Sequence, residues 1–116
     1  MNKCYCWLFL NLFFNIGIIY GANKSHDDRI DHIYSLLRQS HDSVLHQAFT
    51  LLKEEISSEQ RSDVLRCIGI SFQINREKDS SLVYLKKALS EIESVDKSNI
   101  HKIKTNSQIG SVLGSM

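Results

Sequence analysis

Histidine and cysteine are among the side chains of this sequence that could bind a metal or act in nucleophilic catalysis. A metal site on one helix typically needs two histidines four residues apart on one face. No two of the five histidines have this spacing; they are His26, His32, His41, His46 and His101. We therefore predict no metal and no cofactor, and expect solvated histidines or histidines at the edges of helix hairpins.

Cys67 with a distant histidine could form a nucleophile–base pair, but its place in the sequence argues against this role. It lies between apolar positions of a predicted helix, away from a loop or a helix N-terminus. The paired carboxylates Asp27–Asp28 and Glu54–Glu55 are adjacent in sequence, so they point to different faces of a helix. The sequence contains no glycine-rich phosphate loop. We predict that the chain is not an enzyme.

The composition limits the fold class and the kinds of partner. The chain has 116 residues, of which 42% are apolar and 23% charged, with five glycines and no proline. This length fits one small domain, and the scarcity of turn-forming residues predicts an all-α fold. Lysine and arginine together number 14 and the acidic residues 13, with no basic stripe. A nucleic-acid partner for this segment is therefore excluded.

Residues 1–22 differ in composition from the rest of the chain. Lys3 precedes an almost wholly apolar run over residues 4–20, and Gly21 and an alanine then lead into polar sequence. This layout predicts a secretory signal peptide, with cleavage after Gly21 favoured. The main alternative is a signal anchor, because the run is near the lower limit of ~17 residues for a membrane span; a buried helix is a third interpretation. Cleavage and anchoring both place residues 23–116 on the exported side: periplasmic or secreted, or anchored in the inner membrane through residues 4–20.

Loss of the signal segment changes the charge and the cysteine content. It removes Lys3, Cys4 and Cys6, which leaves 13 basic and 13 acidic side chains and Cys67 as a lone cysteine. A lone cysteine cannot form an internal disulfide, so Cys67 is either buried as a small apolar group or free to pair between chains, and we expect burial.

Five amphipathic helical patterns follow one another in residues 23–116. Ser57 or Ser58 is the expected N-cap of the third helix, and Asp79 or Ser80 that of the fourth. Helices of this length joined by short polar segments form antiparallel hairpins. The patterns cover about residues 27–38, 44–56, 59–74, 80–92 and 100–113.

Two pairs of segments repeat at nearly the same distance along the chain. "CIGISF" aligns with "QIGSVL" and places Gly69 over Gly110, 41 residues apart. "LHQAFTLL" aligns with "LKKALSEI" and places Ala48 over Ala88, 40 residues apart. This period is in the range of arrays of helical hairpins.

At these positions the sequence resembles the tetratricopeptide repeat (TPR) family, with about two and a half degenerate repeats of about 40 residues. The repeat positions that match are Leu65, Ile68, Gly69, Phe72, Ser81, Leu85 and Ala88. Leu65 replaces the usual tryptophan, Leu85 the usual phenylalanine, and Glu93 stands where proline would close the repeat. The resemblance implies a short solenoid of stacked hairpins. A generic antiparallel bundle with small residues at its helix crossings is the alternative.

The resemblance also implies why a glycine lies inside a helix. Gly69 on one helix would meet Ser81 and Ala88 on the next, where close packing needs small side chains. Burial of the surrounding large side chains, at about 1.5–3 kcal/mol each, would outweigh the helical cost of glycine, which is about 1 kcal/mol.

Family members hold a peptide or a partner helix on the concave face, lined by the first helix of each repeat. The equivalent positions here are Asp63, Arg66, Ile70 and Gln73. This set departs from the lysine and asparagine clamp that some members use for C-terminal carboxylates, which puts that ligand in doubt. Exposed helix residues with no binding role are an equally good interpretation.

The sequence ends within what would be the first helix of another repeat. We expect the apolar face of this helix to leave an open side, either because it is a terminal cap or because the chain is a fragment of a longer protein; its moderate polarity favours the fragment. The first functional hypothesis is a protein–protein interaction module on the exported side, similar to the N-terminal sensing part of larger bacterial signalling or regulatory proteins. The second is a small secreted or membrane-anchored helical protein with a ligand-binding or enzymatic pocket.

Overall fold

The computed structural model describes residues 25–93, 95 and 99–115, and the predicted signal peptide, residues 1–22, lies outside this part. The described residues form five helices and no strand, so the predicted all-α fold class is confirmed. None of these helices is long and apolar enough to cross a membrane. The helices are α2 (His26–Ser35), α3 (His41–Leu52), α4 (Ser58–Ile74), α5 (Lys78–Glu93) and α6 (Asn99–Gly114).

Serine side chains cap the first three of these helices. Ser25 accepts a hydrogen bond from the backbone N–H of Asp28 at 3.2 Å, and Ser40 caps α3 in the same way. Ser57 forms a capping box with Gln60, in which each side chain accepts a hydrogen bond from the backbone N–H of the other residue. These bonds satisfy N–H groups that have no partner inside the helix.

Four helix ends differ from the prediction by two residues or more. Helix α2 ends at Ser35 rather than at Arg38, and α3 begins at His41 rather than at Val44. Helix α3 ends at Leu52, and Ile56 packs against the core from the following loop. Helix α5 begins at Lys78, so the predicted caps Asp79 and Ser80 lie in its first turn. The turn before α5 starts where predicted but is shorter than the expected residues 75–79, and in it Arg76 adopts a left-handed conformation with φ 64°. This conformation ends α4 with a hydrogen bond from the N–H of Glu77 to the carbonyl of Phe72 at 2.9 Å.

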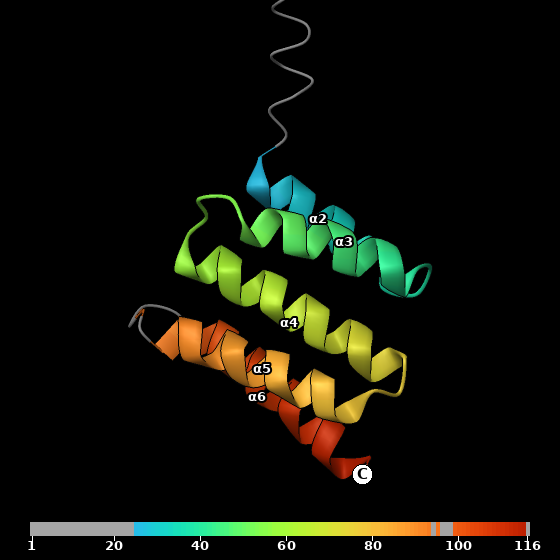
Figure 1. Ribbon diagram of the computed structural model, residues 1–116. Helices are drawn as coiled ribbons and strands as arrows, with labels where there is room; N and C mark the ends of the chain where they lie inside the picture. The colour runs from blue at the N-terminus through green and yellow to red at the C-terminus, as the bar shows by residue number, and fades with distance from the viewer. Residues whose placement is uncertain (1–24, 94, 96–98, 116) are drawn as a thin grey trace, which may run out of the picture.

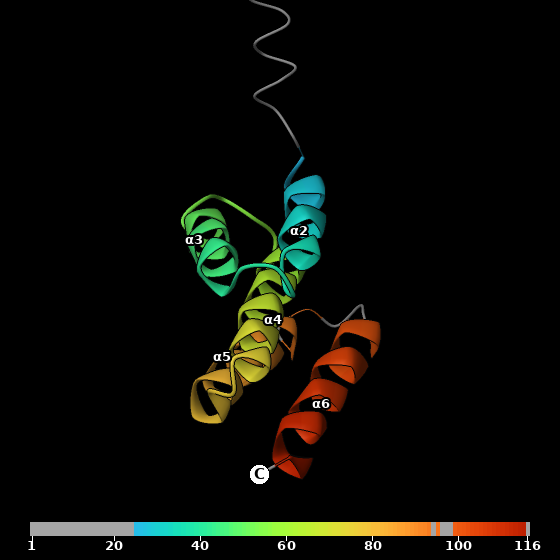
Figure 2. The same ribbon diagram turned by 90° about the vertical axis from the view of Figure 1, so that its right-hand side faces the viewer.

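Helix α4 lies at the centre of the molecule and packs against each of the other four described helices. Figure 1 shows α2 and α3 above α4, and α5 and α6 below it. Seen end-on, α2 and α6 lie on one side of α4, and α3 and α5 on the other (Figure 2). Side chains on one face of α4 therefore lie between α2 and α6.

The core extends along both sides of α4. One part joins α2, α3 and α4 through residues such as Ile33, Leu51 and Ile68, and the other joins α4, α5 and α6. Cys67 is buried in the first part as a free thiol, as predicted. The fully buried residues of the second part include Leu85, Ala88, Ile92 and Val112.

The close approach of α4 and α5 centres on Gly69. An ideal Cβ on Gly69 would lie 2.7 Å from Leu85 Cγ and 3.2 Å from the Ser81 carbonyl oxygen. The buried Ser81 hydroxyl donates a 2.7 Å hydrogen bond to the Gly69 carbonyl. Of the other repeat positions, Leu65, Ile68 and Ala88 are buried, and Phe72 is half-buried and stacks on Tyr84 with ring centroids 5.5 Å apart.

The second glycine of the sequence repeat, Gly110, has a different environment. It is exposed on α6, and a Cβ placed on it would meet no described atom within 4 Å. Ile103 and Leu113 on the same helix are also exposed, whereas Val112 is fully buried. The open side that the sequence predicts for this last helix is therefore present in the described part of the chain.

Candidate functional site

Residues of α2, α4 and α6 line a groove. In Figure 2, α2 and α6 lie on the side of α4 away from α3 and α5. The larger cavity of the groove, about 720 Å³, opens among α2, the turn that follows it, α4 and α6. Its smaller cavity, about 370 Å³, lies between α4 and α6. Both cavities are lined by Ile70 and Gln108, so we treat them as one feature, the α2–α4–α6 groove. The larger is lined by Tyr34, Ser35, Leu37, Arg38, Gln39, Ile70, Gln73, Ile74 and Gln108, and the smaller by Arg66, Ile70, Ile103, Lys104, Ser107 and Gln108.

Three of the four predicted binding residues line this groove. Ile70 lines both cavities, Gln73 lines the larger and Arg66 the smaller. Asp63 lines neither cavity and instead lies beside Arg66. The helical spacing of these residues along α4 places them on one face, since positions three or four apart lie above one another.

Arg66 is buried rather than exposed on the groove, with 8% of its surface accessible. Its Nη2 lies 2.7 Å from Asp63 Oδ1, and its Nε donates to the Tyr34 hydroxyl at 3.1 Å. The Tyr34 hydroxyl in turn donates to the Asp63 carbonyl oxygen at 3.0 Å. His101 of α6 completes the cluster, with Nδ1 3.2 Å from Asp63 Oδ1. Residues from α2, α4 and α6 thus meet around one buried guanidinium.

One donor of this guanidinium lacks a partner. Nη1 of Arg66 is buried and makes no hydrogen bond within the described part of the chain. Burial raises the pKa of the Tyr34 phenol, and the nearby Arg66 charge only partly opposes this effect. Tyr34 therefore stays protonated and holds the guanidinium in position by donating and accepting a hydrogen bond.

Amide side chains join α4 to α6 at the middle of the groove. Gln108 Nε2 donates to Gln73 Oε1, and Gln73 Nε2 donates to the Ser111 hydroxyl at 3.1 Å. Ile74, beside Gln73 in the larger cavity, remains 50% exposed. The groove wall therefore combines hydrogen-bonding amides with uncovered apolar surface.

Cys67 lies in the core rather than in the groove. Burial raises the pKa of its thiol to about 12, and the Arg66 charge opposes that shift only in part. A thiolate nucleophile needs the opposite, a lowered pKa at an accessible position. Within residues 25–93, 95 and 99–115 no group of three histidine, cysteine or carboxylate side chains could hold a metal ion.

The sequence did not reveal the contributions of α2 and α6 to this groove. In the sequence, Tyr34 lies 29 residues from Asp63, and Gln108 lies 35 residues from Gln73. Lys104 shares its cavity with Arg66, which is similarly distant in the sequence. One signal was available for Tyr34: it follows Ile30 by four residues, which places it on the core-facing side of its helix. No comparable local pattern marks Gln108 or Lys104.

Comparison of the chain with protein-family models, curated proteins and solved structures finds no match. The tetratricopeptide resemblance rests on the residue spacing described above.

Proposed function

We propose that this chain is a protein–protein interaction module of the tetratricopeptide type, acting on the exported side of a membrane. In this proposal α2–α3 and α4–α5 are stacked hairpins and α6 is the first helix of a third. The groove between α2, α4 and α6 supports it, because first helices of successive hairpins line the binding face of such arrays. Export follows from the signal-peptide layout of residues 1–22.

The chemistry of the groove suits an extended peptide. Leu37, Ile70 and Ile74 supply apolar surface for side chains, and Gln39, exposed on the rim, is an amide that can pair with a peptide backbone. An extended segment needs both kinds of contact, because its backbone amides lose water when they bind. A sensing role within a larger bacterial regulator is the cellular setting we propose by analogy. We assign no catalytic role to the chain.

The proposal is tested by site-specific photo-crosslinking in envelope extract. A photoreactive amino acid is placed at Gln39 or Gln73, which line the groove, and in matched chains at Glu55 or Lys86, which are exposed and line neither cavity. We expect one partner to be crosslinked from the groove positions and not from the matched positions.

A second substitution in the crosslinking chains distinguishes binding in the groove from non-specific contact. Ile70→Glu places a charge at the point shared by both cavities and should abolish the adduct from Gln73. Equal adducts from Glu55 and Gln73, or an adduct that survives Ile70→Glu, would contradict a groove-bound partner. Circular dichroism of the Ile70→Glu chain checks that the helices remain.

The volume of the larger cavity favours a second candidate, a small-molecule pocket. Its 720 Å³ is within the range of about 300–1,000 Å³ typical of ligand sites. Native mass spectrometry of the purified chain decides between the two: a bound small molecule lost in the Ile70→Glu chain supports the pocket.

A further inference from the structure

We infer that the α2–α4–α6 groove selects a peptide segment that carries an acidic side chain close to a large apolar one. This inference deepens the proposed peptide-binding function and depends on it. The acidic side chain binds in the smaller cavity, at Arg66 and Lys104, and the apolar one in the larger cavity, at Leu37 and Ile74.

Among the described residues, the charged side chains that line the groove all have the same sign. They are Arg38 in the larger cavity and Arg66 and Lys104 in the smaller, and no described residue that lines either cavity is a carboxylate. The whole chain is nearly balanced, with 14 basic and 13 acidic residues. Helix α6 also contains no acidic residue along its length, Asn99–Gly114. A groove with this charge attracts an anionic segment and repels a cationic one.

The carboxylate beside Arg66 is already engaged. Asp63 lies 2.7 Å from Arg66 Nη2 and 3.2 Å from His101 Nδ1. Asp31 of α2, three residues before Tyr34, is exposed and lines neither cavity. Asp63 offsets the charge of Arg66, and Lys104 and Arg38 leave the groove lining with a surplus of positive charge.

The unpartnered nitrogen of Arg66 gives this charge a specific location. Nη1 is buried and lacks an acceptor in the described part of the chain. An unpaired buried donor on a charged group is unfavourable, and a carboxylate is the acceptor that a guanidinium binds best. Lys104 is exposed and lines the same cavity, so it makes the first contact, and the carboxylate then displaces the atoms that cover Nη1.

The two cavities meet at Ile70 and Gln108, which line both. The acidic and apolar side chains of the ligand therefore come from neighbouring positions of one segment. Exposed Ile103, which lines the smaller cavity beside Lys104, adds apolar surface next to the carboxylate site. A short extended peptide can satisfy all of these contacts at once.

The test uses the purified full-length chain and an array of capped nine-residue peptides of randomised sequence. We expect the bound peptides to be enriched in aspartate or glutamate near a large apolar residue. In solution, a glutamate-to-glutamine change in the strongest-binding peptide should weaken binding on the order of tenfold. The Lys104→Glu chain should lose binding to a similar extent and should recover it with a lysine at the acidic position of the peptide.

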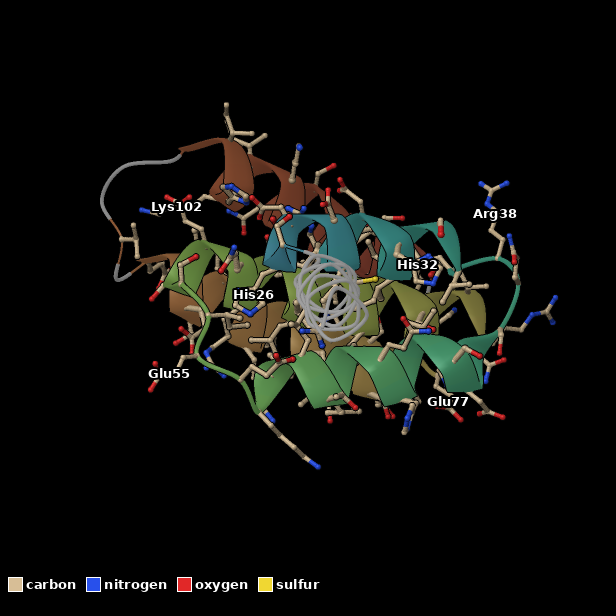
Figure 3. All side chains as sticks on the ribbon, turned by 90° about the horizontal axis from the view of Figure 1, so that it is seen from above. His26, His32, Arg38, Glu55, Glu77 and Lys102 are labelled. Carbon is tan, nitrogen blue, oxygen red and sulfur yellow. The ribbon has the colours of Figure 1, made fainter. Side chains whose placement is uncertain are left out.

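Lys102→Glu is the matched control, because it makes the same charge change two residues away on α6 at a position that lines neither cavity. Lys102 also lies at the opposite end of the molecule from Arg38 (Figure 3). It should leave binding within about twofold of the unmodified chain, as expected for a screened surface charge. Equal losses in the Lys102→Glu and Lys104→Glu chains would overturn the inference.

The remaining outcomes separate this inference from the proposed function. If no peptide binds, or if binding survives Ile70→Glu, the proposed function itself fails. If peptides bind in an Ile70→Glu-sensitive manner without acidic preference, only the selection inferred here is wrong. The peptide could also be displaced by inorganic phosphate but not by chloride at equal ionic strength. This result would indicate a general anion site and would overturn the inferred selection of an acidic side chain.

Discussion

Gly69 and Gly110 occupy equivalent positions in the sequence repeat and opposite environments in the structure. A Cβ on Gly69 would overlap Leu85 at 2.7 Å, whereas one on Gly110 would meet no described atom within 4 Å. Both glycines follow an isoleucine in a helix, in "CIGISF" and "QIGSVL". The difference is the neighbouring helix: α5 crosses α4 at Gly69, and no described helix crosses α6 at Gly110.

This comparison separates two consequences of a glycine within a helix. Glycine weakens any helix through backbone entropy, so both positions carry that cost. Only at Gly69 does the missing side chain permit a helix crossing, with a buried hydrogen bond from Ser81 to the Gly69 carbonyl. Substitutions at the two sites should therefore change stability in opposite directions.

The largest effect is expected for Gly69→Leu. The new side chain would enter the space of Leu85 and of the Ser81 backbone, neither of which is the flexible end of a surface side chain. We expect the free energy of unfolding to fall by about 1–3 kcal/mol, the usual cost of overpacking a core. Urea unfolding followed by circular dichroism measures the change. An unaltered midpoint would contradict the close helix approach.

The matched substitution Gly110→Ala should have a smaller effect of opposite sign. Alanine is the better helix former by about 1 kcal/mol, and its methyl group meets open space at this position. We expect the free energy of unfolding to rise by at most about 1 kcal/mol, which a higher urea midpoint would show. A clear loss of stability on Gly110→Ala would show that the two glycines have the same role and would remove the comparison.

The smallest effect concerns a surface ion pair that involves neither glycine. Arg29 of α2 makes two contacts with Glu54, Nη1 to Oε1 at 2.8 Å and Nη2 to Oε2 at 2.5 Å. The Arg29 hydrogen bond, together with its charge, lowers the pKa of the Glu54 carboxyl from its usual 4.5. The contribution of this pair to stability is therefore fully present above pH 4.5 and is lost as the pH falls through the lowered pKa.

Glu54→Gln isolates this pH dependence. We expect the unmodified chain to lose slightly more stability than the Glu54→Gln chain when urea unfolding is repeated below pH 4.5. High salt should reduce the difference, because the pair is partly exposed. Parallel pH profiles for the two chains would show that the ion pair contributes nothing measurable, as is common at protein surfaces.

The helices were predictable because their signals are local. Apolar spacing marked all five, and Ser57 was among the two residues proposed to cap α4. The errors fall at helix ends, where a single residue decides the outcome. The left-handed conformation of Arg76 ends α4 and lets α5 begin at Lys78. Non-glycine residues seldom adopt this conformation, so arginine at that position carries no recognisable turn signal.

The groove was predictable only in part. The tetratricopeptide resemblance proposed Arg66, Ile70 and Gln73 as binding residues, and each of them lines a cavity. The burial of Arg66 was not expected, because its cause is the Tyr34 phenol of α2 and the Asp63 carboxylate beside it. A long charged side chain on a helix face is ordinarily solvated, and nothing near Arg66 in the sequence indicates otherwise.

The sequence alone determines five amphipathic helices, the burial of Cys67 and the position, Gly69, at which two helices can approach closely. Each of these follows from interactions within a few residues or from the absence of a side chain. The tertiary structure alone decides which glycine is covered, that Arg66 is buried with one free donor, and that α2 and α6 complete the groove. The reason is physical: helical periodicity sets which face a side chain occupies, while helix packing decides what lies opposite that face.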